Sequence, residues 1–280
     1  MRDPGQEQAL LAGLARFLAP FKTIVTFNGK SFDIPLLNSR HVMNAISSPF
    51  VGLPHIDLLP LARRLWRNRL PSRALKDLET AILGMARTED EVPGWMIPEL
   101  YYEYLRSGDA RPLGGVIYHN AQDILSLGLL FNYMADMLEH PLTVAPQQGL
   151  DIIAVARLYE ELHQTEQAVQ LYEYGLGQGL PLPFFLDTLK RYANLYRRQE
   201  QWEQAVTLWK KAADYHQVEA CVELAKYHEH HERNIPEAIR WVDLAFACLE
   251  KIPNSALRAD FQRDLDHRLI RLGQNVSKSE

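Results

Sequence analysis

The segment most informative about the fold is TFNGKSFDIPLL, at residues 26–37. It follows a β-branched run, and Asn28-Gly29 is typical of a strand that ends in a turn. Asp33 then begins a predicted helix, in whose first turn a proline is tolerated. A carboxylate at this place lies at the carboxyl end of a strand, where open α/β sheets place their ligands. On this segment alone, a helix N-cap is the favoured role for Asp33.

The rest of the first half of the chain alternates between short apolar runs and amphipathic segments. Two strands are predicted, at residues 23–27 and 53–56. Apolar residues that share one face predict helices at residues 5–18, 33–42, 57–68, 72–83, 97–107 and 113–139. An acidic loop is expected at residues 88–93. This order, with apolar strands, indicates an α/β layer with a short parallel sheet and helices.

A second informative segment is YHNAQDILSL, at residues 118–127. His119 and Asp123 are four residues apart, so they share one face of the predicted helix. An imidazole beside a carboxylate can combine metal binding with removal of a proton from water. For an isolated pair of this kind, a plain His–Asp contact on the surface is the commoner outcome.

Between these two segments lies a basic stretch, with no acidic residue from 58 to 76. Its cations are Arg63, Arg64, Arg67, Arg69, Arg73 and Lys76. Arg63 and Arg67 share a helix face and Trp66 lies between them, so Arg63, Arg67 and Arg69 are candidates for contact with a phosphate backbone. A solvated helix face is an equally good interpretation. Asp57, just before the stretch, is expected to cap the helix rather than to act as an outer-shell acid.

From about residue 150 the chain is predicted to be helical only, with weak self-similarity. Three pairs of alanines are 12, 12 and 13 residues apart, namely Ala156 and Ala168, Ala193 and Ala205, and Ala225 and Ala238. Small residues at fixed places let two helices cross closely, as in helical-hairpin repeats. The pattern resembles tetratricopeptide-type repeats, although residues 175–183 are interpreted as a Gly/Pro-rich linker and the full repeat signature is absent. An irregular helical domain is the alternative. Repeats would present a concave surface to a protein or peptide partner.

Composition limits the classes of function. The chain is 47% hydrophobic and 23% charged, which is ordinary for a globular protein. Residues 1–145 hold 14 basic and 15 acidic side chains, and residues 146–280 hold 16 and 20, so any nucleic-acid contact needs a local patch. Cys221 and Cys248 form no CxxC motif, which argues against a disulfide framework and favours a reducing cytoplasm. Neither a signal core nor a membrane span is expected.

Together the two motif segments resemble a known family. The pattern Asn-x-x-x-Phe-Asp-x-Pro-Leu-Leu, from Asn28, resembles the second motif of the DEDD-type 3′–5′ exonuclease superfamily, and His-Asn-x-x-Asp-Ile-Leu-x-Leu, from His119, resembles the third. LPHIDLL at 53–59 and SRALKDLE at 72–79 resemble the intervening segments. Over about residues 1–140 the chain is similar to the YprB-like ribonuclease-H-like group, whose members can carry helical repeats after the nuclease-like domain. The resemblance implies such a domain at residues 1–142 and tetratricopeptide-like repeats at residues 150–273.

The resemblance also implies a chemistry. The family uses two divalent ions, Mg²⁺ or Mn²⁺, held by four acids, to hydrolyse phosphodiester bonds of DNA or RNA. On this resemblance, Asp33 and Asp123 match the acids of the second and third motifs and are the predicted catalytic metal ligands. His119 would orient the attacking water, although it fits neither family pattern cleanly. Asn28 is expected to support the nucleic acid locally.

One part of the family pattern does not occur. The first motif, Asp-x-Glu on a strand, would supply the other two acids, and no such motif precedes Asp33. The chain is therefore expected to begin inside the domain, through a start set too far downstream or, less favoured, because the protein is degenerate. Two carboxylates hold an ion weakly, so little or no nuclease activity is predicted for residues 1–280 alone. The alternative function is an inactive nucleic-acid-binding or protein-interaction scaffold that uses the helical repeats.

Overall fold

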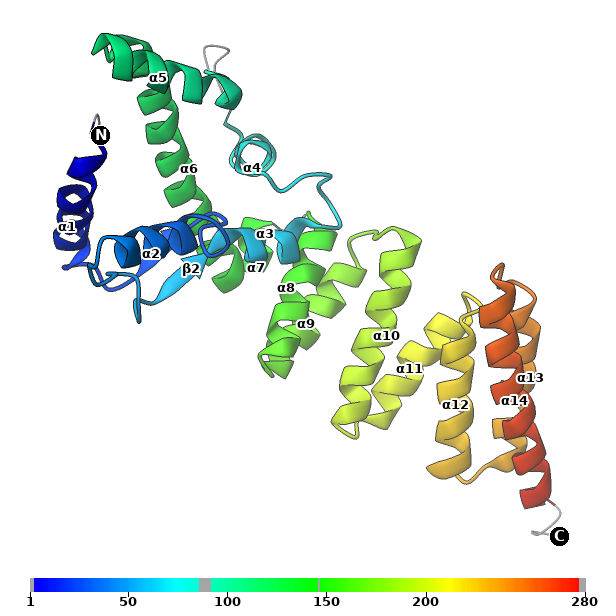
Figure 1. Cartoon of the computed structure of the whole chain (residues 1–280). Coiled ribbons are helices and arrows are strands. Elements are labelled where there is room, and N and C mark those ends of the chain that lie inside the picture. Colours follow the sequence, from blue (N-terminus) through cyan, green and yellow to red (C-terminus); the bar gives the residue numbers. More distant parts are fainter. Residues whose placement is uncertain (1–2, 86–91, 146, 277–280) are drawn as a thin grey trace. The chain divides into compact units, whose positions relative to one another are not determined.

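The computed structural model describes residues 3–85, 92–145 and 147–276 of the chain. It divides into two compact units, Met1–Pro146 and Gln147–Glu280, which we call unit 1 and unit 2 (Figure 1). Unit 1 contains a small sheet with helices, and the described part of unit 2 is helical. No described helix combines the length and the apolar character that crossing a membrane requires.

The sheet of unit 1 has two described strands, β1 (Ile24–Thr26) and β2 (His55–Asp57). They run parallel, with Ile24 opposite His55 and Thr26 opposite Asp57, so the predicted short parallel sheet is confirmed. The second strand begins two residues later than predicted. The reason is that Leu53 closes a turn through its N–H to the Phe50 carbonyl, 3.3 Å away.

The helices of unit 1 follow the predicted segments closely. They are α1 (Glu7–Leu18), α2 (Asp33–Met43), α3 (Leu58–Trp66), α4 (Leu75–Ala81), α5 (Ile97–Ser107), α6 (Gly114–Glu139) and α7 (Pro141–Val144), with short 3₁₀ turns at Pro4–Gln6, Gly94–Met96 and Arg111–Leu113. α4 begins later than predicted because the Ser72 hydroxyl accepts the Ala74 N–H and holds that segment in a turn. The predicted acidic loop lies largely outside the described residues.

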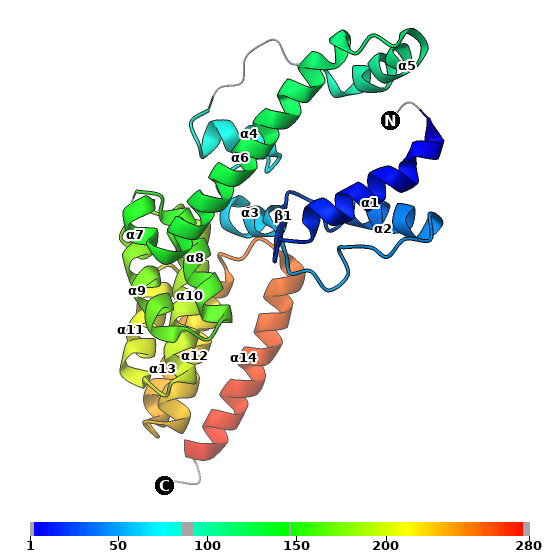
Figure 2. The same cartoon turned by 90° about the vertical axis from the view of Figure 1, so that its left-hand side faces the viewer.

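The core of unit 1 is formed mainly by α3 and the second half of α6. Leu58, Ala62, Leu65 and Trp66 of α3 are buried, as are Leu130, Met134 and Met137 of α6. The Trp66 ring lies 6.4 Å from the ring of Tyr133, between ring centroids. α4 packs against α6, the long helix that Figure 2 shows running past it.

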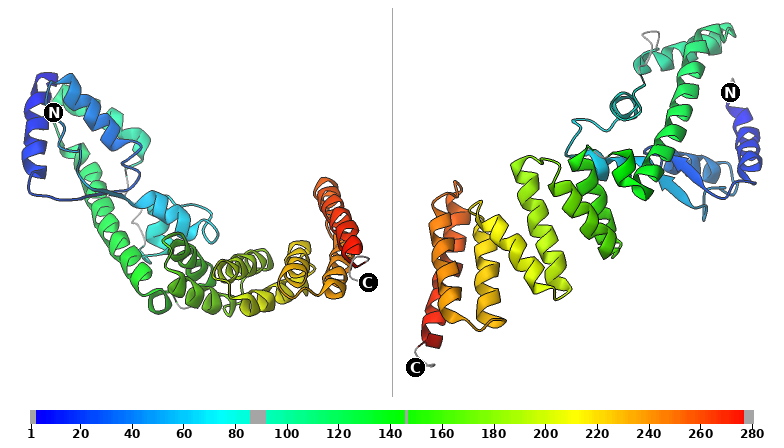
Figure 3. Two further views of the ribbon diagram at one scale, coloured as in Figure 1. Left: turned by 90° about the horizontal axis from the view of Figure 1, so that it is seen from below. Right: turned by 180° about the vertical axis from the view of Figure 1, so that it is seen from behind.

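Unit 2 is a succession of helices that pack on their neighbours in chain order (Figure 3). They are α8 (Gly149–Glu161), α9 (Thr165–Leu176), α10 (Leu182–Arg198), α11 (Trp202–Ala213), α12 (Val218–His230), α13 (Ile235–Leu249) and α14 (Ser255–Val276). All six alanines of the three predicted pairs have an exposed fraction of 0%. Because an alanine adds only a methyl group, its neighbours can approach the helix backbone closely there.

One expectation for unit 2 is wrong. Gly175 was predicted to lie in a linker, but it is a buried residue of α9. A Cβ atom at Gly175 would stand 2.5 Å from Cδ1 of Ile153 on α8. The glycine therefore permits close packing of α8 and α9, and the connection to α10 begins only after Leu176.

Candidate functional site

The carboxyl end of the two-stranded sheet is organised around the side chain of Asp57. Its Oδ1 accepts the Asn28 N–H at 2.7 Å and the Leu59 N–H at 3.2 Å, and its Oδ2 accepts the Lys30 N–H at 3.0 Å. The predicted helix cap is confirmed, because the Leu59 contact caps α3. The two other contacts join β2 to the loop after β1, and they occupy both oxygens of a nearly buried carboxylate.

The loop after β1 has a constrained backbone. Asn28 adopts a φ of 67°, in the left-handed region that asparagine tolerates better than most residues. Gly29 is buried, and a Cβ atom there would stand 2.6 Å from Cβ of Thr26. Asn28-Gly29 is therefore a turn that Asp57 holds through the N–H groups of Asn28 and Lys30, and this is the role that the structure displays for Asn28.

His55 supports the same turn from the neighbouring strand. Its Nε2 lies 2.7 Å from Oγ1 of Thr26. Burial lowers the pKa of His55, and the charge of Lys30 lowers it further, against a smaller opposing effect of Asp57. The imidazole is therefore favoured in its neutral form, in which one ring nitrogen accepts a hydrogen bond.

Asp33 is exposed and is the first residue of α2, just beyond this loop. The N-cap position belongs to Phe32, so the cap role that the segment alone favoured for Asp33 is wrong. A carboxylate in the first turn is instead stabilised by the positive end of the helix dipole. Its exposure at the carboxyl end of β1 leaves it accessible to a ligand from solution.

His119 and Asp123 form a pair on α6. Nε2 of His119 lies 3.4 Å from Oδ2 of Asp123, and the two side chains are 28% and 37% exposed. Both lie on the helix face that continues into buried Ser126 and Leu130. The pair is thus partly sheltered, and it forms as the spacing predicted.

The basic stretch is only partly available for nucleic acid. Arg63 and Arg67 are exposed, at the last turn of α3 and at its C-cap, and Arg69 is half-buried. Cations at this end of a helix also interact favourably with the helix dipole. Trp66 has an exposed fraction of 0%, so the expectation that this ring interleaves with the arginines on the surface is wrong. The helix period places Trp66 on the buried face.

The described residues do not assemble a metal site. They contain no group of three or more His, Cys, Asp or Glu side chains that could hold an ion. Neither Asp33 nor Asp123 belongs to such a group, and the oxygens of Asp57 already accept amide hydrogens. The side chains present do not fit the divalent ions that the family resemblance implies, so no step of a reaction is derived through a metal.

Two comparisons with known proteins place these features in context. A model of the RNase_H superfamily matches residues 1–135. The chain is also 31% identical over 273 residues to the protein YprB of Bacillus subtilis (strain 168), an alignment that covers 93% of this chain. The aligned part is 64% of the length of YprB, so the chain spans less than two thirds of this relative.

Proposed function

Because residues 1–135 match a model of the RNase_H superfamily, we propose that the chain processes nucleic acid by the phosphodiester chemistry of 3′–5′ exonucleases. The observation that supports this proposal is the position of Asp33. It lies exposed just after a turn that Asp57 fixes at the carboxyl end of a parallel sheet, which is where α/β folds bind ligands. Asp33 and Asp123 are the two carboxylates that we assign to the hydrolytic site, with His119 as the neighbour of Asp123.

Hydrolysis by these 280 residues alone is proposed to be weak. Catalysis at a two-metal site needs carboxylates that fix both ions, and the described residues bring no three candidate ligands together. DNA or RNA binding does not depend on a complete set of ligands. Arg63 and Arg67, with Arg69, are proposed to contact the phosphate backbone.

The second candidate function is a scaffold built on unit 2. The complete burial of the paired alanines supports the proposal that α8 to α13 are three helical hairpins of tetratricopeptide-like type. In that case unit 2 presents a surface to a protein or peptide partner. The two functions are compatible, because they are assigned to different units.

The test measures binding and hydrolysis separately on the whole chain. Labelled single-stranded DNA and RNA are titrated without metal, and then incubated with Mn²⁺ or Mg²⁺. We expect binding that weakens with salt, and little hydrolysis. Hydrolysis that Asp123→Asn and Asp33→Asn abolish, and that Asp77→Asn retains, would show that the chain is an active nuclease. The absence of both binding and hydrolysis would refute the nucleic-acid role and leave the scaffold.

The arginine assignment has a matched control. Removing two phosphate contacts with Arg63→Ala/Arg67→Ala should reduce the slope of log K against log salt by about 1.4 for a single strand. Arg16→Ala/Arg106→Ala removes the same charge from exposed positions elsewhere in unit 1 and should leave the slope nearly unchanged. If both double variants lower the slope equally, Arg63 and Arg67 act only through their general charge and not through direct phosphate contacts.

A further inference from the structure

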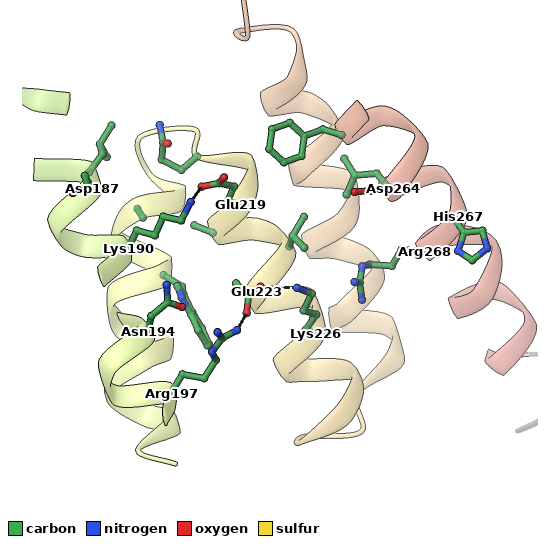
Figure 4. Close-up of a pocket in the computed structure, with 18 of the residues that line it drawn as sticks. Asp187, Lys190, Asn194, Arg197, Glu219, Glu223, Lys226, Asp264, His267 and Arg268 are labelled. Atoms are coloured by element: carbon green, nitrogen blue, oxygen red, sulfur yellow. Dashed lines mark hydrogen bonds and ion pairs between the residues drawn. The ribbon is translucent and has the colours of Figure 1, made fainter. Parts of the chain in front are cut away.

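Unit 2 contains a groove that none of the predicted site residues lines. Side chains from α10, α11, α12 and α14 line a volume of about 840 Å³, including those of Leu186, Lys190, Asn194, Val222, Lys226 and Leu265 (Figure 4). Ligand pockets commonly fall in this range of volume. Apolar residues and charged residues both face the groove, so a ligand there can bury apolar surface and make directed polar contacts.

The α10 side of the groove is a polar stripe. Lys190, Asn194 and Arg197 recur at spacings of four and three residues, which places them on one face of the helix. Lys190 is paired with Glu219 of α12, with Nζ 2.7 Å from Oε2. Asn194 is half-buried between the two cations along the helix. Its side-chain amide has a donor and an acceptor, and so can pair with the N–H and C=O of an extended backbone.

Two carboxylates each organise a pair of cations at the groove. Glu223 lies 2.8 Å from Nη1 of Arg197 and 2.6 Å from Nζ of Lys226, and its side chain is 20% exposed. Glu229 lies 3.0 Å from Nη1 of Arg268 and 2.6 Å from Nη2 of Arg271, and its side chain is 6% exposed. Each cluster has two positive charges and one negative charge, so each has an excess of one positive charge. The carboxylates hold the cations in place, which lowers the entropy lost when a ligand binds them.

This local excess is opposite to the charge of the surroundings. Residues 146–280 hold 20 acidic and 16 basic side chains, whereas five Lys or Arg and four Asp or Glu line the groove, with Glu229 as a fifth acid beside Arg268 and Arg271. One of those acids, Asp187, is itself neutralised by Arg157, at 2.6 Å, and by Arg191, at 3.3 Å. An anionic ligand is therefore favoured at the two cation clusters over the rest of unit 2.

We propose that this groove binds an extended peptide segment that carries two acidic side chains. Each acidic side chain meets one cation cluster, and Asn194, which stands on α10 beside Arg197, pairs with the peptide backbone next to the first cluster. The cations of the first cluster stand on α10 and α12 and those of the second on α14, so a peptide that meets both clusters runs across these helices. The proposal deepens the scaffold function assigned to unit 2, on which it rests.

A nucleic-acid strand fits the groove less well. Its regularly spaced phosphates would lie against Glu219 and Asp264 as well as against the cations. Single-strand sites also use exposed aromatic rings on which bases stack, and Trp209, which lines the groove, is only 4% exposed. Alternating charges with an apolar floor match a peptide, in which acidic side chains can be placed at intervals.

The test uses the whole chain and an array of eight-residue peptides with two Asp residues at separations of one to six, beside the same series with Asn. We expect binding that depends on the separation of the two Asp residues, and about tenfold weaker or undetectable binding in the Asn series. The best Asp peptide is then measured in solution by fluorescence anisotropy. No binding of any Asp peptide, equal binding of the Asn series, or no dependence on separation would overturn the proposal.

Variants that keep each carboxylate paired separate binding from folding. Lys226→Gln leaves Glu223 with Arg197, and Arg271→Gln leaves Glu229 with Arg268. Each should weaken the best peptide about fivefold to tenfold without changing the melting temperature greatly. Lys210→Gln makes the same charge change at an exposed position outside the groove and should have less than about a twofold effect. An effect of Lys210→Gln as large as the groove variants would overturn the proposal.

Competition with an oligodeoxythymidine tests whether the groove binds a nucleic acid instead of a peptide. We expect it not to displace the peptide, and displacement that is sensitive to Lys226→Gln and Arg271→Gln would replace the peptide with a nucleic acid. The nuclease proposal is tested on residues of unit 1 with a different ligand. Loss of peptide binding therefore leaves that test unaffected, and the two failures can be told apart.

Discussion

The two units differ in how completely they bury their own apolar side chains. Among the described residues, unit 2 has 29 buried apolar side chains and six large exposed ones, whereas unit 1 has 11 buried and 18 exposed. The helices of unit 2 each pack on the next one along the chain, so local contacts complete the core. The described part of unit 1 has two short strands, and a sheet of two strands offers little surface for helices to cover.

The helix α6 of unit 1 has apolar side chains that are buried in one half and exposed in the other. The second half of α6 buries Leu130, Met134 and Met137. The first half exposes Ile117, Ile124 and Leu125, which are 68%, 64% and 52% exposed. These three share the face opposite to His119 and Asp123. An amphipathic pattern therefore predicts which apolar side chains need to be covered, whereas the residues that cover them come from elsewhere in the fold.

The largest expected effect on stability is the difference between truncating a buried leucine of unit 2 and truncating an exposed leucine of unit 1. Leu224→Ala in α12 removes a side chain that is 0% exposed and should lower the free energy of unfolding by about 2–5 kcal/mol. Leu125→Ala in α6, where the side chain is 52% exposed, should lower it by less than about 0.5 kcal/mol. Chemical denaturation followed by circular dichroism measures both. A large loss of stability in Leu125→Ala would contradict the difference between the two units, because it would show that this face of α6 is covered in solution.

A smaller effect is expected at the turn that positions Asp33. Gly29→Ala brings a Cβ atom to 2.6 Å from the Thr26 side chain and should destabilise this loop by about 1–3 kcal/mol. The N–H groups of Asn28 and Lys30 donate hydrogen bonds to the Asp57 carboxylate, and their hydrogen exchange should become faster. Gly13→Ala is the control, since no atom lies within 4 Å of a Cβ there and alanine favours the helix. Unchanged protection in Gly29→Ala would show that the loop adapts without loss.

The smallest effect is expected in the chemical labelling of two cysteines in the buried core of unit 2. Cys221 and Cys248 are buried, and burial, with the neighbouring Cys248, raises the pKa of Cys221 to about 12. Burial likewise raises the pKa of Cys248. The thiolate is the reactive form, so iodoacetamide at about pH 8 should label the native chain very slowly and the denatured chain readily. Rapid labelling of the native chain would show that unit 2 opens more easily than its packing indicates.

Helix and strand bounds were predictable where residues close in the sequence set them. The helix at 97–107 has the predicted bounds, because Pro98 marks its first turn and Gly108 ends it in the left-handed conformation. The shift of β2 and the place of Gly175 were not predictable. The first depends on a turn closed by Phe50, and the second depends on how near α8 comes to α9.

The candidate site shows the same division. The sequence spacing was sufficient to pair His119 with Asp123, since four residues make about one helical turn. The cap at Asp57 was predictable as well, but its contacts to Asn28 and Lys30 cross 29 and 27 residues of chain. The sequence could also have placed Trp66 correctly, because it lies four and eight residues after Ala62 and Leu58 and so shares the apolar face of α3. Its contact with Tyr133 depends on the packing of α3 against α6.

The amino-acid sequence alone predicts the order of the elements, the turn at Asn28-Gly29, the carboxylates of the two motifs and the resemblance to an RNase H-like domain. These follow from residue types and spacings within a few turns of chain. Packing brings Asp57 to the loop before Asp33, Arg197 to Glu223, and Arg268 and Arg271 to Glu229. Such contacts join residues far apart in the chain, and their partners are set by packing, which no short sequence pattern encodes.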